Sequence, residues 1–180
     1  MKKTISFIFA ALLSSVILTG CSVSAPKGIE PVEPFSIDRY LGTWYEIARM
    51  DHSFEEGLSQ VTAHYSVRED GGVKVINRGY SEEDQAWDEA EGKAYFEEDS
   101  ETGHLKVSFF GPFYGAYVIF SLDDDYQYSL VSGPDRSYFW LLSRTPTISE
   151  QKQEALLEAA AAAGFDTEKL IFVDQSKHQG

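Results

Sequence analysis

Short alternating runs of apolar and polar residues fill most of this chain from Gly42 onward, with turn residues such as Gly71-Gly72 between them. Alternation with a period of two is typical of strands that bury one face. No helical pattern separates these runs, so they predict an antiparallel meander, which most simply removes its exposed edges by closing into a barrel. The eight predicted strands span 43–50, 60–68, 72–80, 90–97, 104–110, 115–122, 126–132 and 137–144.

The same alternation predicts which side chains point into the barrel. If Trp44 points inward, Glu46 and Ala48 follow it. Small residues such as Gly92 and Ala94 share this face with aromatic ones, which favours an internal cavity; the alternative is that large neighbours fill the gaps. The other predicted inward residues are Ala63, Tyr65, Val67, Val73, Val75, Asn77, Ala90, Phe96, Leu105, Val107, Phe109, Tyr117, Ile119, Ser129, Val131, Tyr138, Trp140 and Leu142.

A single helix is predicted after the last strand. Thr147 and Glu150 have the spacing of a capping box, and the alanine run 159–163 is followed by Gly164, a residue typical of helix C-termini. The apolar stripe of this helix is expected to pack on outward-facing residues of the last strand, and residues 171–173 to add a short strand outside the barrel. The stripe consists of Leu156, Leu157 and Ala160, and the receiving residues are Phe139 and Leu141.

The N-terminus reads as a targeting segment. Residues 1–20 combine a lysine pair with a short apolar stretch, and Leu18-Thr19-Gly20-Cys21 resembles the lipobox of bacterial lipoproteins. The resemblance implies that Cys21 is lipidated and becomes the mature N-terminus; the alternative is an ordinary signal peptide with a chance cysteine. Ser22, rather than aspartate, favours the outer membrane, on its periplasmic side. Residues 21–36, which contain three prolines, predict a flexible tether, and residues 37–176 the folded domain.

Composition excludes several classes of function. The chain carries a net charge of −14, and without residues 1–20 it has 13 bases and 29 acids, a net charge of −16, which disfavours nucleic-acid binding. Cys21 is the only cysteine, so no disulfide forms within the chain. No phosphate-binding loop, dinucleotide motif or nucleophile elbow occurs. The histidines are scattered, so we expect no metal, no cofactor and no catalytic residue; they are His52, His64, His104 and His178.

Three motifs resemble those of the lipocalins. They are Gly42-Thr43-Trp44-Tyr45, an aspartate-rich turn before Tyr128, and Ser143-Arg144-Thr145-Pro146. The resemblance implies an all-β fold, an eight-stranded antiparallel up-and-down barrel with a C-terminal α-helix packed outside. It also implies that Trp44 lies under Arg144 at the closed end of the barrel. Gly42 would allow the tight backbone turn that leads into the first strand there. The second motif departs from the family pattern, because aspartates replace its Thr-Asp-Tyr turn, and the register from Leu122 to Tyr126 stays open.

The segments 109–115 and 133–136 look most like the bacterial outer-membrane lipoprotein lipocalins, and that resemblance implies fatty acids or lysophospholipids as ligands. No lysine or arginine is confidently inward at mid-barrel. An anionic head group would therefore meet His52, Arg136 or no side chain at all. The ligand-binding residues we expect are Glu46, Tyr65, Asn77, Phe96, Phe109, Tyr117, Tyr138 and Trp140.

Two other functions stay open. Some lipocalins are enzymes, and Glu46 would be the acid or base of a lipid-modifying or isomerising one. A filled barrel would instead suit a structural envelope protein. As an inward carboxylate, Glu46 must be either a satisfied buried acid or a residue that orients a ligand. Monomer and homodimer are both compatible with the sequence.

Overall fold

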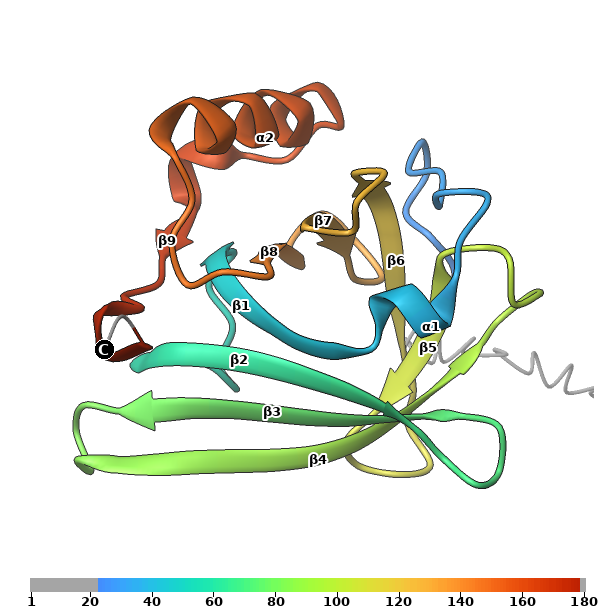
Figure 1. Ribbon diagram of the computed structural model, residues 1–180, viewed down its shortest axis with the longest axis horizontal. Coiled ribbons are helices and arrows are strands. Elements are labelled where there is room, and N and C mark those ends of the chain that lie inside the picture. The colour runs from blue at the N-terminus through green and yellow to red at the C-terminus, as the bar shows by residue number, and fades with distance from the viewer. Residues whose placement is uncertain (1–22, 179–180) are drawn as a thin grey trace, which may run out of the picture.

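The computed structural model describes residues 23–178, and within them a closed antiparallel barrel (Figure 1). The strands follow the order β2-β3-β4-β5-β6-β7-β8-β1, and β1 also pairs with β2, which closes the sheet. A ninth strand pairs with the outside of β1. The predicted barrel, outer helix and extra strand are thereby confirmed. The predicted signal peptide and the predicted lipidation site, Cys21, lie outside the described residues.

The elements lie close to their predicted positions. The helices are α1 (Ile37–Tyr40) and α2 (Glu150–Ala162), and two 3-10 turns follow at Thr167–Lys169 and Ser176–His178. The strands are β1 (Gly42–Arg49), β2 (Leu58–Val67), β3 (Val73–Ser81), β4 (Ala86–Phe96), β5 (His104–Ser108), β6 (Gly115–Leu122), β7 (Tyr128–Ser132), β8 (Phe139–Ser143) and β9 (Ile171–Phe172).

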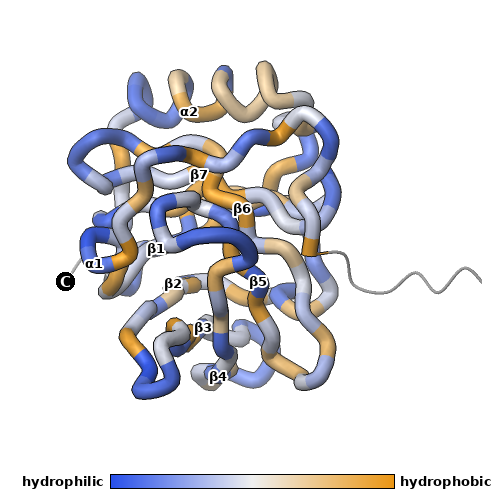
Figure 2. Tube along the Cα trace, turned by 90° about the vertical axis from the view of Figure 1, so that its right-hand side faces the viewer, coloured by the Kyte–Doolittle hydropathy of each residue, from blue (hydrophilic) through white to orange (hydrophobic). Residues whose placement is uncertain are grey.

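The strands separate two hydrophobic cores, one inside the barrel and one between the barrel and α2. In Figure 2, α2 lies above the barrel, next to β7 and β6, whereas β2, β3 and β4 form the lower side of the barrel. The inner core gathers around Trp44, Val75 and Val131, whereas the outer core contains Phe139, Leu141 and Ala160, as the alternation predicts. Leu156 and Leu157 of α2 also pack against the outer core.

A β-bulge at Ile47 interrupts the alternation in β1. Glu46 pairs with Leu142, but Ala48 pairs with Leu141, so two steps along β1 match one step along β8. An extra residue reverses the facing of every side chain that follows it. Ala48 is therefore in the outer core, which corrects the prediction that it points inward, and Arg49 turns into the barrel instead.

Two more predicted inward residues are solvent-exposed because their strands extend past their neighbours. Val67 is 65% exposed at the end of β2, two residues beyond the last pair with β1, Gly42 with Tyr65. Ala90 is exposed because β4 pairs with β5 only from Lys93 onward. The inward prediction is therefore wrong where only one strand continues.

The segment before α1 is folded onto the barrel. Ile29 and Phe35 are both 4% exposed, and the first belongs to the outer core and the second to the inner core. Backbone hydrogen bonds join Val32 to Ile119 and Phe35 to Glu101. Burying two large side chains favours an ordered segment, so for residues 23–36 the expected flexible tether is wrong.

The C-terminal helix starts two residues later than the capping box predicts. Ser149 is the N-cap, and its hydroxyl accepts a hydrogen bond from the Lys152 backbone N–H, so Thr147 does not cap the helix. Gly164 follows the helix with φ of 88°, the left-handed conformation expected there. In the described part of the chain, no helix is both long and apolar enough to cross a membrane.

Candidate functional site

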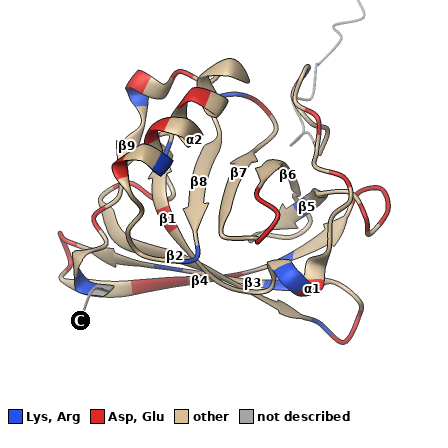
Figure 3. Ribbon diagram, turned by 45° about the horizontal axis from the view of Figure 1, so that its top comes forward, with Lys and Arg blue, Asp and Glu red and all other residues tan. Residues whose placement is uncertain are grey.

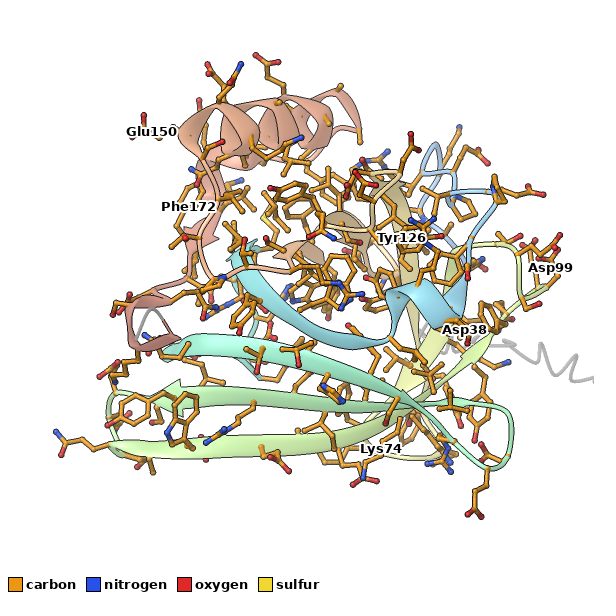
Figure 4. The ribbon with its side chains drawn as sticks, in the orientation of Figure 1. Asp38, Lys74, Asp99, Tyr126, Glu150 and Phe172 are labelled. Carbon is orange, nitrogen blue, oxygen red and sulfur yellow. The ribbon has the colours of Figure 1, made fainter. Side chains whose placement is uncertain are left out.

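The closed end of the barrel is built around Arg144 and Trp44. The guanidinium lies 4.0 Å from the centre of the indole ring, within cation–π range. Gly42 has a φ of 95°, and an added Cβ would lie 3.4 Å from Arg144 Nη1, so glycine suits the turn into β1. Figure 4 shows Tyr126 beside α1 at this end. Arg144 also donates to the backbone carbonyls of Thr43 at 2.9 Å, Arg39 at 2.8 Å and Tyr126 at 3.3 Å.

A chain of hydrogen-bonded hydroxyl groups lies inside the barrel, next to this closed end. Tyr117 Oη is 2.7 Å from Tyr65 Oη and 2.9 Å from Tyr40 Oη, which is 3.1 Å from Ser129 Oγ. Burial raises the pKa of Tyr40 to about 12. Burial also raises the pKa values of Tyr65 and Tyr117 well above the usual range of a tyrosine. The groups therefore stay neutral. Tyr65 and Tyr117 are brought together here, with their hydroxyls already paired.

Three inward-facing aromatic side chains stay partly exposed: Phe96 near the closed end, where its ring centroid lies 6.2 Å from that of Phe35, and Phe109 and Trp140 toward the mouth. All three pack against the inner core. Asn77 is partly buried as well, and its Oδ1 is buried without a hydrogen-bond partner. At Gly92 the predicted free space is filled, because an added Cβ would lie 2.8 Å from the Phe109 ring.

The mouth is the end opposite α1, where four loops connect successive strands (Figure 1). In the loop 50–57 between β1 and β2, the Glu55 side chain is 5% exposed, while Phe54 beside it is 60% exposed. The other mouth loops are 82–85, 109–114 and 133–138.

Glu55 meets two charged residues of β1 inside the barrel. Arg49 Nη1 donates to Glu46 Oε1 at 2.8 Å, and both side chains are almost fully buried. Arg49 Nη2 donates to the backbone carbonyls of Glu55 at 2.7 Å and Leu58 at 3.3 Å. Glu55 Oε2 accepts a hydrogen bond from Trp140 Nε1 at 3.1 Å. The interior thus contains two acids and one cation.

Burial raises the pKa of Glu46 well above its usual range and raises the pKa of Glu55 as well. The negative charge of Glu55 adds to the effect on Glu46, and Arg49 opposes it. The two carboxyl groups also share a hydrogen bond, which needs a proton on one of them. Burial thus favours the protonated form of both carboxyl groups, and Arg49 is the cation that opposes this effect on each of them.

His52 closes the same end with stacked rings. Its imidazole lies 5.1 Å from the Phe54 ring and 4.8 Å from the Tyr138 ring, measured between centroids, and 5.0 Å from Trp140. Burial lowers the pKa of His52 to about 4, with Arg49 as a further cause. Its Nε2 is buried without a hydrogen-bond partner. Tyr138 is therefore a rim residue rather than part of the inner core.

Arg136, the other residue considered for an anionic head group, is engaged outside the barrel. It donates through Nε to the Ala163 carbonyl at 2.9 Å and through Nη2 to the Lys27 carbonyl at 3.0 Å. These bonds connect the 133–138 loop to the end of α2 and to the N-terminal segment.

Arg49 and Glu55 are the site residues that the sequence reasoning missed. One signal for Arg49 is present, because an inward acid at Glu46 needs a partner, and the nearest cation in the chain is Arg49, three residues away. Glu55 gives no such signal, since it lies in a loop without periodicity. Among residues 23–178, no group of three or more histidine, cysteine, aspartate or glutamate side chains could hold a metal ion.

Comparisons with known proteins agree on one family. Residues 35–175 match the lipocalin-like domain. The outer membrane lipoprotein Blc of Vibrio cholerae is 58% identical over 165 residues, covering 91% of this chain and 96% of that protein. The protein of the same name from Escherichia coli K12 is 49% identical over 173 residues, covering 96% and 98%. The cockroach allergen Per a 4 has the same fold, with a TM-score of 0.66, 21% identity and coverage of 88% and 97%.

Proposed function

Because the chain belongs to the lipocalin family, we propose that it is an outer-membrane lipocalin whose barrel binds hydrophobic ligands, with fatty acids or lysophospholipids as its ligands. The observation that carries the proposal is the partly exposed aromatic wall of the interior, formed by Phe96, Phe109, Tyr117 and Trp140. Inward aromatic side chains that are not fully buried offer apolar surface against which an acyl chain could pack. Burying that chain would contribute about 25 cal/mol per Å² of apolar area.

The location follows the relatives. Proteins that are 58% and 49% identical over more than nine-tenths of this chain are named outer membrane lipoproteins. Lipidation at Cys21 would hold the barrel at the membrane, facing the periplasm, since several acyl chains bind a bilayer stably. The charge distribution disfavours nucleic acid as a partner, because acidic residues lie on α2 and several loops (Figure 3).

Binding without chemical change is the function that the interior favours over catalysis. Glu46, the residue considered as a catalytic acid or base, already accepts a hydrogen bond from Arg49 at 2.8 Å and is 3% exposed. A buried acid with a charged partner is satisfied without a substrate. The proposal therefore assigns Glu46 a structural role beside the ligand and assigns the protein no reaction.

Lipid titration of delipidated protein tests the proposal. We expect saturable binding of palmitic acid or 1-palmitoyl lysophosphatidylethanolamine, followed by displacement of a neutral fluorescent dye. Val107→Gln should weaken binding roughly tenfold, because it places an amide against the acyl chain. Lys106→Gln, on the outward face of the same strand, is the matched control and should change affinity less than twofold. Absence of saturable binding of both lipids would overturn the proposal.

A further inference from the structure

The mouth contains two buried nitrogen atoms that form no hydrogen bond with the protein. Arg49 is 2% exposed, yet its Nε has no hydrogen-bond partner, and His52 is 6% exposed with Nε2 unpartnered. Unpaired buried polar atoms are rare in folded proteins, because each has lost its hydrogen bonds to water without gaining new ones. Both residues lie where β1 leads into the 50–57 loop, which makes this end of the interior suited to a polar group from outside the protein.

Glu55 reaches this region from a loop rather than from the barrel wall. It is 5% exposed, whereas its neighbour Glu56 is exposed, and Gly57 follows with a φ of 73°. Its carboxylate accepts the Trp140 Nε1–H at 3.1 Å, and its backbone carbonyl accepts Arg49 Nη2–H at 2.7 Å. A loop carboxylate thus occupies a polar position directly above the aromatic wall.

We propose that Glu55 occupies the head-group position, and that the oxyanion of a bound lipid replaces its carboxylate beside Arg49 and Trp140. This inference rests on the proposed carrier function and adds the recognition of the head group. The shared chemistry is an oxyanion, either the carboxylate of a fatty acid or the phosphate of a lysophospholipid. Glu55 then moves outward with the exposed part of its loop, and the lipid accepts the hydrogen bonds that Glu55 leaves.

Charge balance supports the exchange. Glu46 and Arg49 stay in place at 2.8 Å, so the incoming anion finds the same cation and the same neighbouring acid that Glu55 finds. A carboxylate or a singly charged phosphate that takes the place of the Glu55 carboxylate replaces one anion with another, so the charge of the interior does not increase. A neutral alcohol gains less there, because hydrogen bonds to charged groups are about twice as strong as neutral ones.

The test compares ligands that differ only in the head group. Palmitic acid, 1-palmitoyl lysophosphatidylethanolamine and 1-hexadecanol are titrated at pH 7.5 by displacement of a neutral dye. Arg49→Gln should weaken binding of at least one anionic lipid about tenfold and of hexadecanol less than twofold. The anionic lipid that responds identifies the head group as carboxylate or phosphate.

Glu55→Gln tests the exchange itself. The variant keeps the shape of the side chain but removes the competing charge, so the anionic lipid should bind about three- to tenfold more tightly and hexadecanol as before. Glu56→Gln, the exposed neighbour, is the matched control and should leave all affinities unchanged. Equal effects of Glu55→Gln on acid and alcohol would overturn the proposal.

Trp140→Phe provides a second route if Arg49→Gln fails to fold. It removes the Nε1 donor, keeps an aromatic wall, and should lower the ratio of acid to alcohol affinity about threefold. An unchanged ratio in Trp140→Phe, and in Arg49→Gln if that variant folds, would make the role of Arg49 purely structural and overturn the inference, while the carrier function would stand. If none of the three lipids binds the unmodified protein, the carrier function itself fails.

Discussion

The barrel has an arginine at each end, and the two residues differ in how completely they are satisfied. Arg144 lies over Trp44, and each of its three guanidinium nitrogens donates to a backbone carbonyl. Arg49 is more deeply buried, is paired with Glu46, and keeps one nitrogen without a partner. An arginine that donates through all three nitrogens holds a structure together, whereas one with a buried Nε that has no partner, beside an acid, has capacity left for a ligand.

Removing Arg49 should produce the largest effect. Arg49→Met leaves Glu46 and Glu55 buried without a cation, so we expect a loss of about 3–5 kcal/mol in the free energy of unfolding at pH 8. Urea denaturation at pH 8 and pH 5.5 measures it. The pKa of each acid is raised in the folded state, which then binds more protons than the unfolded state, so the loss should be smaller at pH 5.5.

The matched control for Arg49→Met is Lys74→Met. Lys74 forms an exposed ion pair with Glu91 at 2.9 Å on the outside of the sheet, where Figure 4 labels it. Exposed pairs contribute about 0–1 kcal/mol, so this variant should stay near the wild type. Equal losses for the two variants would contradict the special role of the buried cluster.

Arg144→Met should cost about 2 kcal/mol, because it removes a cation–π contact and hydrogen bonds to three carbonyls but keeps an apolar stem over Trp44. No acid is left unpaired by the change. Urea denaturation should therefore give the same loss at pH 8 and pH 5.5. A loss that depended on pH would show that the closed end also contains a coupled titrating group.

Tyr117→Phe should cost about 1–2 kcal/mol, since it removes the hydroxyl between Tyr40 and Tyr65. If the head group binds at the mouth, the ratio of palmitic acid to hexadecanol affinity should not change. The same titration that tests Arg49 measures this ratio. A changed ratio would move head-group recognition to the hydroxyl chain near the closed end.

His52→Gln should have the smallest effect, and only in acid. The folded pKa of His52 is about 4, below its ordinary value near 6.5, so the unfolded state binds the proton first and stability falls as the pH drops from 6.5 toward 4. The variant should lose about 1 kcal/mol less than the wild type between pH 7 and pH 4.5, because solvent at the mouth screens part of the effect. Parallel pH profiles of the two proteins would contradict the assignment.

Most of the barrel could be predicted because alternation depends on local sequence and the strands are long enough to show it. Residues such as Val75 and Val131 in the inner core and Phe139 and Leu141 in the outer core follow from a period of two. The Trp44 and Arg144 contact followed from the motifs, because residues of one family motif keep their partners across members.

The mouth could be predicted less well, for two physical reasons. A bulge adds one residue to a strand and leaves no mark in the composition. Alternation therefore placed Ala48 inside the barrel, and so its neighbour Arg49 outside, which is the reverse of the structure. Glu55 and the N-terminal residues Ile29 and Phe35 lie in segments without regular structure, where burial depends on distant partners such as Trp140. Local patterns carry no information about such contacts.

The bulge at Ile47 makes the charge of the barrel interior depend on one extra residue. A strand with the same residues but no bulge would direct Arg49 outward, toward α2. Glu46 and Glu55 would then lie inside the barrel without a cation. Two homologous chains with identical residues here could thus differ in ligand preference if only one of them carried the bulge. A single-residue insertion or deletion in β1 is, in this protein, an electrostatic change as much as a geometric one.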